Sequence, residues 1–172
     1  MPYITRYHVI SQTGHVLTLA GFLLHIIGVS TVYWAEDNGG NMYGIFEMCY
    51  QDLGQCYPIR VEDPTLILCQ AFAVIAIVLC ALSFVAILVY WCHMMLAEQR
   101  LKFYLIFSVV LGILAAASIG FCDLMFYRYI HDMKLGKSFI ESGVGGVVVL
   151  TGSVVSAGFL ACRPRDQYQP IN

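Results

Sequence analysis

The longest uncharged stretch of the chain contains TLILCQAFAVIAIVLCALSFVAILVYWC, from Thr65 to Cys92, and extends to Ala97. A helix needs about 20 apolar residues to cross about 30 Å of hydrocarbon, and helices buried in soluble cores have shorter apolar stretches. The length of this stretch therefore predicts that it crosses a membrane.

Three other stretches reach a similar length: Gly14 to Trp34, Phe103 to Cys122 and Gly143 to Cys162. The 172 residues are 59% hydrophobic and only 12% charged, whereas a soluble domain carries about 25% charged residues. The first stretch is longer than the core of a signal peptide and ends in bulky residues, so we interpret it as a retained span. The sequence predicts a transmembrane all-α protein, with one domain of four antiparallel helices over residues 1–172.

The predicted spans leave two loops, 35–64 and 123–142, on one side of the membrane. The inner loop, 93–102, both termini and a polar tail, 163–172, lie on the other side. The side of the termini carries five Lys and Arg residues and the other side four. Because the positive-inside rule compares these counts, it gives little guidance on orientation here.

Cysteine supplies a second argument about orientation. Only Cys49 and Cys56 lie well away from the predicted spans. Asp52, Leu53 and Gly54 lie between them and suit a turn, so the two thiols could meet across a hairpin and oxidise if the loop is outside the cell. The alternative is two free thiols in a cytosolic loop. We expect the disulfide, and therefore a multi-pass plasma membrane protein with cytosolic termini.

The other five cysteines lie in or beside the spans. We expect Cys69, Cys80 and Cys122 to be small buried residues inside the bundle. Cys92 and Cys162 lie at the predicted cytosolic edge of the membrane, where thiols can accept palmitate. These two residues are therefore candidate palmitoylation sites.

Small residues recur at helical spacing in the spans. In lipid, helices associate where small side chains let the backbones approach, because burying apolar surface gains little there. The spacing predicts packing inside a compact bundle or, alternatively, contact with another membrane protein. The candidate packing residues are Gly14, Gly21 and Gly28 on the first span, Gly112, Ala116 and Gly120 on the third, and Gly152 and Ser156 on the fourth.

Ionisable side chains are almost absent from bilayer depth, where a membrane enzyme or transporter would need them. Only His25 lies deep inside a span, and we expect it to be hydrogen-bonded within the bundle rather than to bind a metal or move a proton. The sequence contains no GxSxG, HExxH, Walker or Rossmann pattern. We therefore expect no catalytic residues, metal, cofactor or nucleic-acid partner, and a protein that is not an enzyme.

The first outer loop carries the most specific pattern. Trp34 is followed by GIF at 44–46, then by two residues, Cys49, six residues and Cys56. This resembles the W…GLW…C…C signature of the superfamily of claudins, peripheral myelin protein, epithelial membrane proteins and calcium-channel gamma subunits. The segment LGKSF at 135–139 is similar to the family segment that leads into the fourth span.

The resemblance implies a small extracellular antiparallel sheet on the helical bundle, formed mainly by the first outer loop and held by the disulfide. It also implies roles for the residues of the pattern. Trp34 would anchor the base of the loop at the lipid boundary, and Gly44 would permit a tight backbone. Ile45 and Phe46 would insert into the outer mouth of the bundle.

The function that the resemblance implies is that of a claudin-like protein of cell–cell junctions, which contributes to adhesion and to the paracellular barrier. Its partners would be the lipid bilayer and the same or related four-span proteins, in the same membrane and on the next cell. The acidic first outer loop would favour cations along any path that it lines. Its charged residues are Glu36, Asp37, Glu47, Asp52, Glu62 and Asp63, against Arg60.

Two alternatives stay open at the level of the sequence. One is an accessory, gamma-like subunit of an ion channel or receptor, whose third and fourth spans pack against a partner. The other is a membrane organiser like peripheral myelin protein. The sequence also departs from claudins, because residues 69–71 lack an Arg and the last four residues, QPIN, do not end in a hydrophobic residue.

Overall fold

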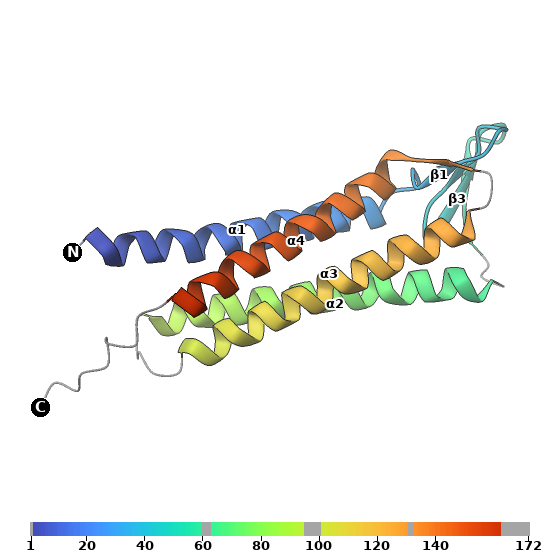
Figure 1. Cartoon of the computed structure of the whole chain (residues 1–172). Coiled ribbons are helices and arrows are strands. Elements are labelled where there is room, and N and C mark those ends of the chain that lie inside the picture. Colours follow the sequence, from blue (N-terminus) through green and yellow to red (C-terminus); the bar gives the residue numbers. More distant parts are fainter. Residues whose placement is uncertain (1, 60–62, 95–100, 131–132, 163–172) are drawn as a thin grey trace, which may run out of the picture.

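Four long helices make up most of the computed structural model, which describes residues 2–59, 63–94, 101–130 and 133–162 (Figure 1). Each helix contains an apolar segment long enough to cross a membrane. The prediction of four such helices with a small antiparallel sheet is confirmed. The helices are α1 (Pro2–Val29), α2 (Pro64–Met94), α3 (Leu101–Tyr129) and α4 (Lys137–Cys162).

Large apolar side chains cover the outward faces of the helices. On α3, exposed aromatic and aliphatic side chains recur three, four or seven residues apart, which places them on one face. A soluble bundle would carry polar residues on such a face. The outward surface is therefore suited to hydrocarbon, which suggests a multi-pass membrane protein. The α3 residues are Phe103, Phe107, Val110, Leu114 and Phe121.

α1 and α4 pack along a seam of small residues. A methyl group added at Gly21 would lie 2.6 Å from the backbone oxygen of Gly145, which is closer than carbon and oxygen can approach. Because the α1 glycines are spaced by seven residues, they all face the same neighbour. The other contacts of the seam join Gly14 to Gly152 and Ser156, and Gly28 to Ser138 and Ser142.

α2 and α3 form a second close pair. The sulfur atoms of Cys69 and Cys122 lie 3.4 Å apart, and the hydroxyl oxygens of Ser83 and Ser108 lie 3.0 Å apart. Both steps, from Cys69 to Ser83 and from Cys122 to Ser108, cover two heptads, which is the repeat of helices packed at a shallow angle. Cys80 is also buried, so the three cysteines predicted inside the bundle do lie there.

Contacts between α3 and α4 join the two pairs, whereas α1 and α2 touch only slightly. Gly112 packs against Ser153 of α4, but a side chain at Gly120 would meet no atom within 4 Å. The predicted packing role inside the bundle therefore does not hold for Gly120. The reason is the four-residue spacing, because each step from Gly112 through Ala116 to Gly120 turns about 40° around the helix and leaves the seam.

A five-stranded antiparallel sheet lies at one end of the bundle, which we call the sheet end (Figure 1). Four of its strands come from the segment between α1 and α2, and the fifth from the segment between α3 and α4. The strand order is β4-β3-β2-β1-β5. The strands are β1 (Ala35–Glu36), β2 (Met42–Tyr43), β3 (Glu47–Tyr50), β4 (Gln55–Pro58) and β5 (Lys134–Leu135).

Several helix ends differ from the predicted span ends. α1 ends at Val29 rather than at Trp34, and α3 continues to Tyr129. α4 begins at Lys137, so most of the loop predicted over 123–142 is helical. Charge marks where hydrocarbon ends, but a helix can continue into the polar interface. The tail 163–172 and most of the predicted inner loop lie outside the described residues.

The seam between α1 and α4 predicts a position-specific effect of one methyl group. Gly21→Ala should lower the free energy of unfolding by about 1–3 kcal/mol, because the added carbon overlaps the α4 backbone. Gly120→Ala is the matched control, since its methyl group meets open space and alanine favours the helix. The measurement is thermal unfolding of the purified protein in detergent. Equal unfolding midpoints for the two variants would contradict the close packing of α1 against α4 at Gly21.

Candidate functional site

The sheet end holds most of the residues singled out by the sequence pattern. The predicted disulfide joins Cys49 of β3 to Cys56 of β4, which are directly opposite each other in the ladder. Gly54, with a φ of 58°, turns the chain between the two strands, and its N–H donates to the carbonyl of Tyr50. The hairpin β3–β4 is thus closed by a turn and a covalent bond.

Trp34 lies between α1 and β1, at the base of the loop that it is expected to anchor, and its ring is directed into the core rather than outward. Its side chain is fully buried, and its ring packs edge-on against Phe126 of α3 and Phe139 of α4. The indole N–H donates to the carbonyl of Gly28 at 2.6 Å. That carbonyl lies in the last turn of α1, where helix carbonyls lack helical partners, and it also accepts from the backbone and the hydroxyl of Thr31. The indole therefore fills the core and takes part in capping the helix.

The GIF triplet places one large side chain inside and one outside. Ile45 is fully buried, as predicted, but Phe46 is 39% exposed, so the predicted insertion of both is wrong for Phe46. Adjacent residues of an extended segment point to opposite sides, and only one can face the bundle. Gly44 is buried, and a methyl group there would lie 3.0 Å from the carbonyl oxygen of Thr31.

A polar side chain of α2 ties this triplet to the bundle. The side-chain amide of Gln70 donates to the carbonyl of Ile45 at 2.9 Å. A buried backbone carbonyl needs such a donor. Gln70 lies in the region where an Arg was missing from the expected pattern, and it holds the loop through a neutral hydrogen bond.

The segment LGKSF joins the sheet to the start of α4. The N–H of Gly136 donates to the carbonyl of Trp34, and that of Ser138 donates to the carbonyl of Tyr33. Gly136 lies so close to the backbone at Tyr33 that no side chain would fit there. β5 is therefore fixed against β1 by backbone contacts that require glycine.

The acidic residues of the sheet divide into exposed and hydrogen-bonded ones. Asp37 accepts hydrogen bonds from the side chain of Asn41 at 2.9 Å and from the hydroxyl of Tyr43 at 3.2 Å. The bond from Asn41 is the main cause that lowers the pKa of Asp37. Arg60 and Glu62 lie outside the described residues. The exposed carboxylates are Glu36, Glu47, Asp52 and Asp63.

A chain of buried and partly buried hydrogen bonds joins three helices below the sheet. Ser142 of α4 donates to Asp123 of α3 at 2.9 Å, and its oxygen lies 3.0 Å from Nδ1 of His25 on α1. With Ser142 donating to Asp123, the tautomer of His25 that carries its proton on Nδ1 completes the chain. His25 thus has the predicted partner inside the bundle.

Asp123 is the polar residue of this chain that sequence reasoning missed. It was assigned to the second outer loop, but it lies within α3, between Cys122 and Phe126, which both face the core. The buried side chains of α3 keep their three- and four-residue spacing through this point. That spacing was the signal that the helix continues past the charge.

Asp123 also lines a hollow of about 280 Å³ between α3 and α4. The remaining lining is apolar or small, and it includes Gly120, Gly143 and Val147. Gly120, which has open space beside it, lines this hollow. The hollow therefore has room for a lipid chain or for a side chain of another protein.

The opposite end of the bundle carries the two candidate palmitoylation sites. Cys92 is a free, exposed thiol near the end of α2. Cys162 is the last residue of α4, and its side chain lies outside what the structure describes. Among the described residues, no three His, Cys, Asp or Glu side chains are placed to hold a metal ion.

Comparison with known proteins leaves the site to be interpreted from its own geometry. No family model matches the chain, and no curated protein matches it.

Proposed function

We propose that this chain is a four-span plasma membrane protein of cell–cell junctions that presents its sheet outside the cell. The apolar outward faces of the helices support insertion in a bilayer. The disulfide supports an oxidising environment for the sheet. With the sheet outside, the start of α1 and the end of α4 lie in the cytosol, because both are at the opposite end of the bundle (Figure 1).

The observation that carries the junctional role is the rigid seating of the sheet. Hydrogen bonds of Trp34, Gln70 and Ser138 join the loop of the sheet to α1, α2 and α4, and the disulfide holds its outer hairpin. A surface held in this way is pre-organised, so little conformational entropy is lost when it binds a second surface. It suits adhesion between like molecules on neighbouring cells, as in the claudin-like proteins that the loop pattern resembles.

The adhesive role predicts that cells made to express the chain aggregate and concentrate it at their contacts. Replacing both Cys49 and Cys56 by Ser should reduce aggregation, because loss of a disulfide costs about 2–4 kcal/mol of stability. Cys92→Ser is the control, since this thiol is free and lies at the other end of α2. The measurement is aggregate size at equal surface expression. Aggregation that survives loss of the disulfide, or no aggregation by the unaltered chain, would contradict the proposal.

The exposed carboxylates support a preference for cations along a path beside the sheet. Glu36, Glu47, Asp52 and Asp63 face solvent, and no salt bridge neutralises them within the part of the chain that the structure describes. Their combined field raises the local concentration of cations and lowers that of anions.

This charge predicts opposite effects of two substitutions on neighbouring strands. Glu36→Gln should lower the sodium-to-chloride permeability ratio of an epithelial layer that expresses the chain, and Lys134→Gln should raise it. The two residues are directly opposite in the β1–β5 ladder, so position is matched and only the sign of the charge differs. Dilution potentials measure the ratio. Equal sodium and chloride permeability, or a change in the same direction for both variants, would contradict a cation-selective path.

The hollow between α3 and α4 favours a second candidate, an accessory subunit of a channel or receptor. Its small residues would let a partner helix approach closely, and Asp123 could accept a hydrogen bond from a donor on that helix. The small residues and Asp123 line a hollow on the outward face of the bundle. If no partner helix fills this hollow, lipid does.

The accessory role predicts a discrete complex that a filled hollow disrupts. Gly120→Leu places a large side chain in the hollow, so a partner membrane protein that copurifies with the unaltered chain should be lost. Gly158→Leu is the matched control, because Gly158 is also open and exposed but does not line the hollow. The measurement is quantitative copurification from native membranes in mild detergent. If the same partner copurifies with both variants, the hollow between α3 and α4 is not the binding surface for that partner.

A further inference from the structure

The sheet gathers aromatic side chains on one of its two faces. Tyr43 is opposite Met48 in the β2–β3 ladder, and Met48 is opposite Tyr57 in the β3–β4 ladder. Residues that pair in this way point to the same side, and so does Tyr50, two positions along from Met48. The disulfide lies on the other side, because Cys49 is adjacent to Met48.

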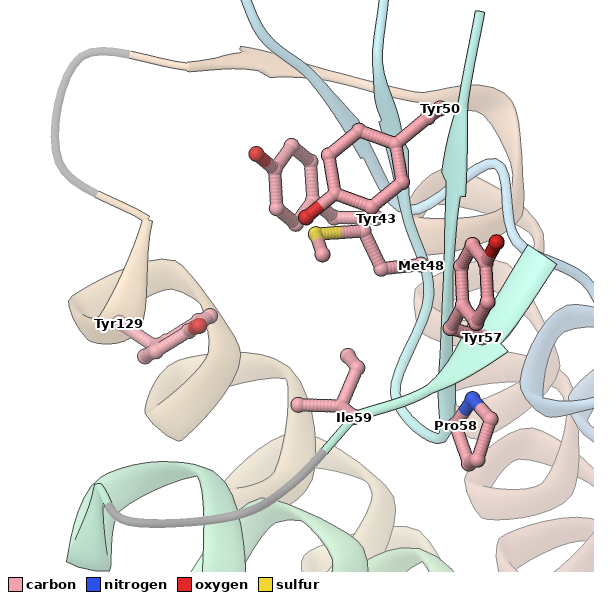
Figure 2. A pocket seen from close by; sticks show the side chains of 7 residues that line it. All are labelled: Tyr43, Met48, Tyr50, Tyr57, Pro58, Ile59 and Tyr129. Carbon is pink, nitrogen blue, oxygen red and sulfur yellow. The ribbon is translucent and has the colours of Figure 1, made fainter. Parts of the chain in front are cut away.

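This face covers a pocket at the junction with the bundle, which we call the tyrosine pocket (Figure 2). Its volume is about 620 Å³, within the usual range for sites that bind small molecules. Figure 2 shows the side chain of Tyr129 reaching from the end of α3 toward the sheet, with Tyr43, Met48 and Tyr50 across from it. Tyr57, Pro58 and Ile59 complete the lining, and none of the described lining residues is charged.

The hydroxyl groups of two of these tyrosines already have partners. Tyr43 donates to Asp37, and Tyr57 donates to Gln55. The hydroxyls of Tyr50 and Tyr129 have no hydrogen-bond partner among the described residues, so the pocket offers ring faces, a methionine sulfur and two phenol hydroxyls. An occupant with an apolar or cationic surface, and with an acceptor for a phenol hydroxyl beside it, fits this lining best.

The electrostatics of the pocket favour a positive charge. Ring faces attract cations within about 6 Å. The rings of Tyr50 and Tyr57 have centroids 6.1 Å apart, so one bound group can contact both. Asp37 is hydrogen-bonded to Tyr43, and the charge of Asp63 acts on Tyr129. Burial and the bond to Asp37 raise the pKa of Tyr43, so this ring stays a neutral phenol.

The pocket also lies at a particular depth. Tyr129 is the last residue of α3 and of its apolar, span-length segment. The end of such a segment lies at the level of the lipid headgroups. A positively charged group without hydrogen-bond donors is abundant at that level as the trimethylammonium of choline lipids.

We propose that the tyrosine pocket binds the trimethylammonium group of a phosphatidylcholine headgroup from the outer leaflet. This inference rests on the membrane orientation in the proposed function but not on the junctional role. Binding would hold a lipid against the base of the sheet, with the cation between the rings of the sheet and Tyr129.

The test compares lipids that differ only in the methyl groups on nitrogen. The purified full chain in detergent is titrated with dioleoyl phosphatidylcholine or dioleoyl phosphatidylethanolamine, and bound lipid is counted by native mass spectrometry. We expect about tenfold tighter binding of phosphatidylcholine. Both headgroups carry a cation that ring faces attract, but the ammonium of phosphatidylethanolamine must give up hydrogen bonds to water that the ring faces do not replace. Tetramethylammonium should displace the lipid. Equal binding of the two lipids would overturn the proposal.

Variants of the rings locate the site. Replacing Tyr50 and Tyr129 together by Leu should abolish the preference, whereas replacing both by Phe should keep most of it, because the ring faces remain. Tyr127→Leu is the matched control, since Tyr127 is exposed on the same end of α3 and does not line the pocket. Should the double Leu variant fail to fold, Tyr50→Leu alone, on the sheet, must still weaken the preference.

Three further outcomes would overturn the inference. The first is a lipid preference that survives in the double Leu variant, and the second is a preference that Tyr127→Leu also abolishes. The third is binding of soluble phosphocholine as tightly as the lipid, because the membrane would then not be the source of the ligand. Cell aggregation by an unaltered chain that shows no lipid preference would reject the tyrosine pocket alone and leave the junctional role standing.

Discussion

The burial of Trp34 is the contact on which the arrangement of sheet and helices depends. The ring fills the space between Phe126 and Phe139, and its N–H donates to the carbonyl of Gly28. Its backbone joins β1 to its neighbours, through bonds with Tyr43 on one side and Gly136 on the other. Three helices and three strands therefore meet at one residue, and the sheet cannot tilt on the bundle without exposing the indole or leaving a buried polar group unpaired.

Below this point, the backbone geometry follows from small side chains in the seams. Glycine and serine occupy the contact between α1 and α4, and cysteine and serine occupy the contact between α2 and α3. The large apolar side chains are left to face outward, which is the arrangement expected where the surroundings are hydrocarbon rather than water. The same arrangement leaves the hollow beside Gly120 and the polar chain through Asp123. Both are features that a partner helix or a lipid can contact.

Length, apolarity and cysteine spacing were sufficient to predict the four helices and the disulfide, because each depends on local sequence. The small sheet was expected only from the family that the loop pattern resembles, and its fifth strand comes from a distant segment of the chain. The loop pattern also marked Trp34, Gly44 and Ile45 as structural residues. What local sequence did not show were the contacts between distant segments.

The burial of Trp34 depends on Phe126 and Phe139, which lie about ninety residues or more away in the sequence. The charge of Asp123 predicts the end of a span, whereas the helical spacing of the buried residues around it indicates that α3 continues. The tyrosine pocket arises only when the strand register brings Tyr43 and Tyr57 to one face and α3 brings Tyr129 beneath them.

The central claim is that the sheet lies outside the cell on a bundle embedded in the membrane. An epitope inserted beside Gly54, in the exposed turn between β3 and β4, tests it directly when paired with an epitope at the C-terminus. On intact cells the account predicts that antibody labels the Gly54 epitope, and that the C-terminal epitope is labelled only after permeabilisation. Labelling of the C-terminal epitope on intact cells, with the Gly54 epitope hidden until permeabilisation, would contradict it.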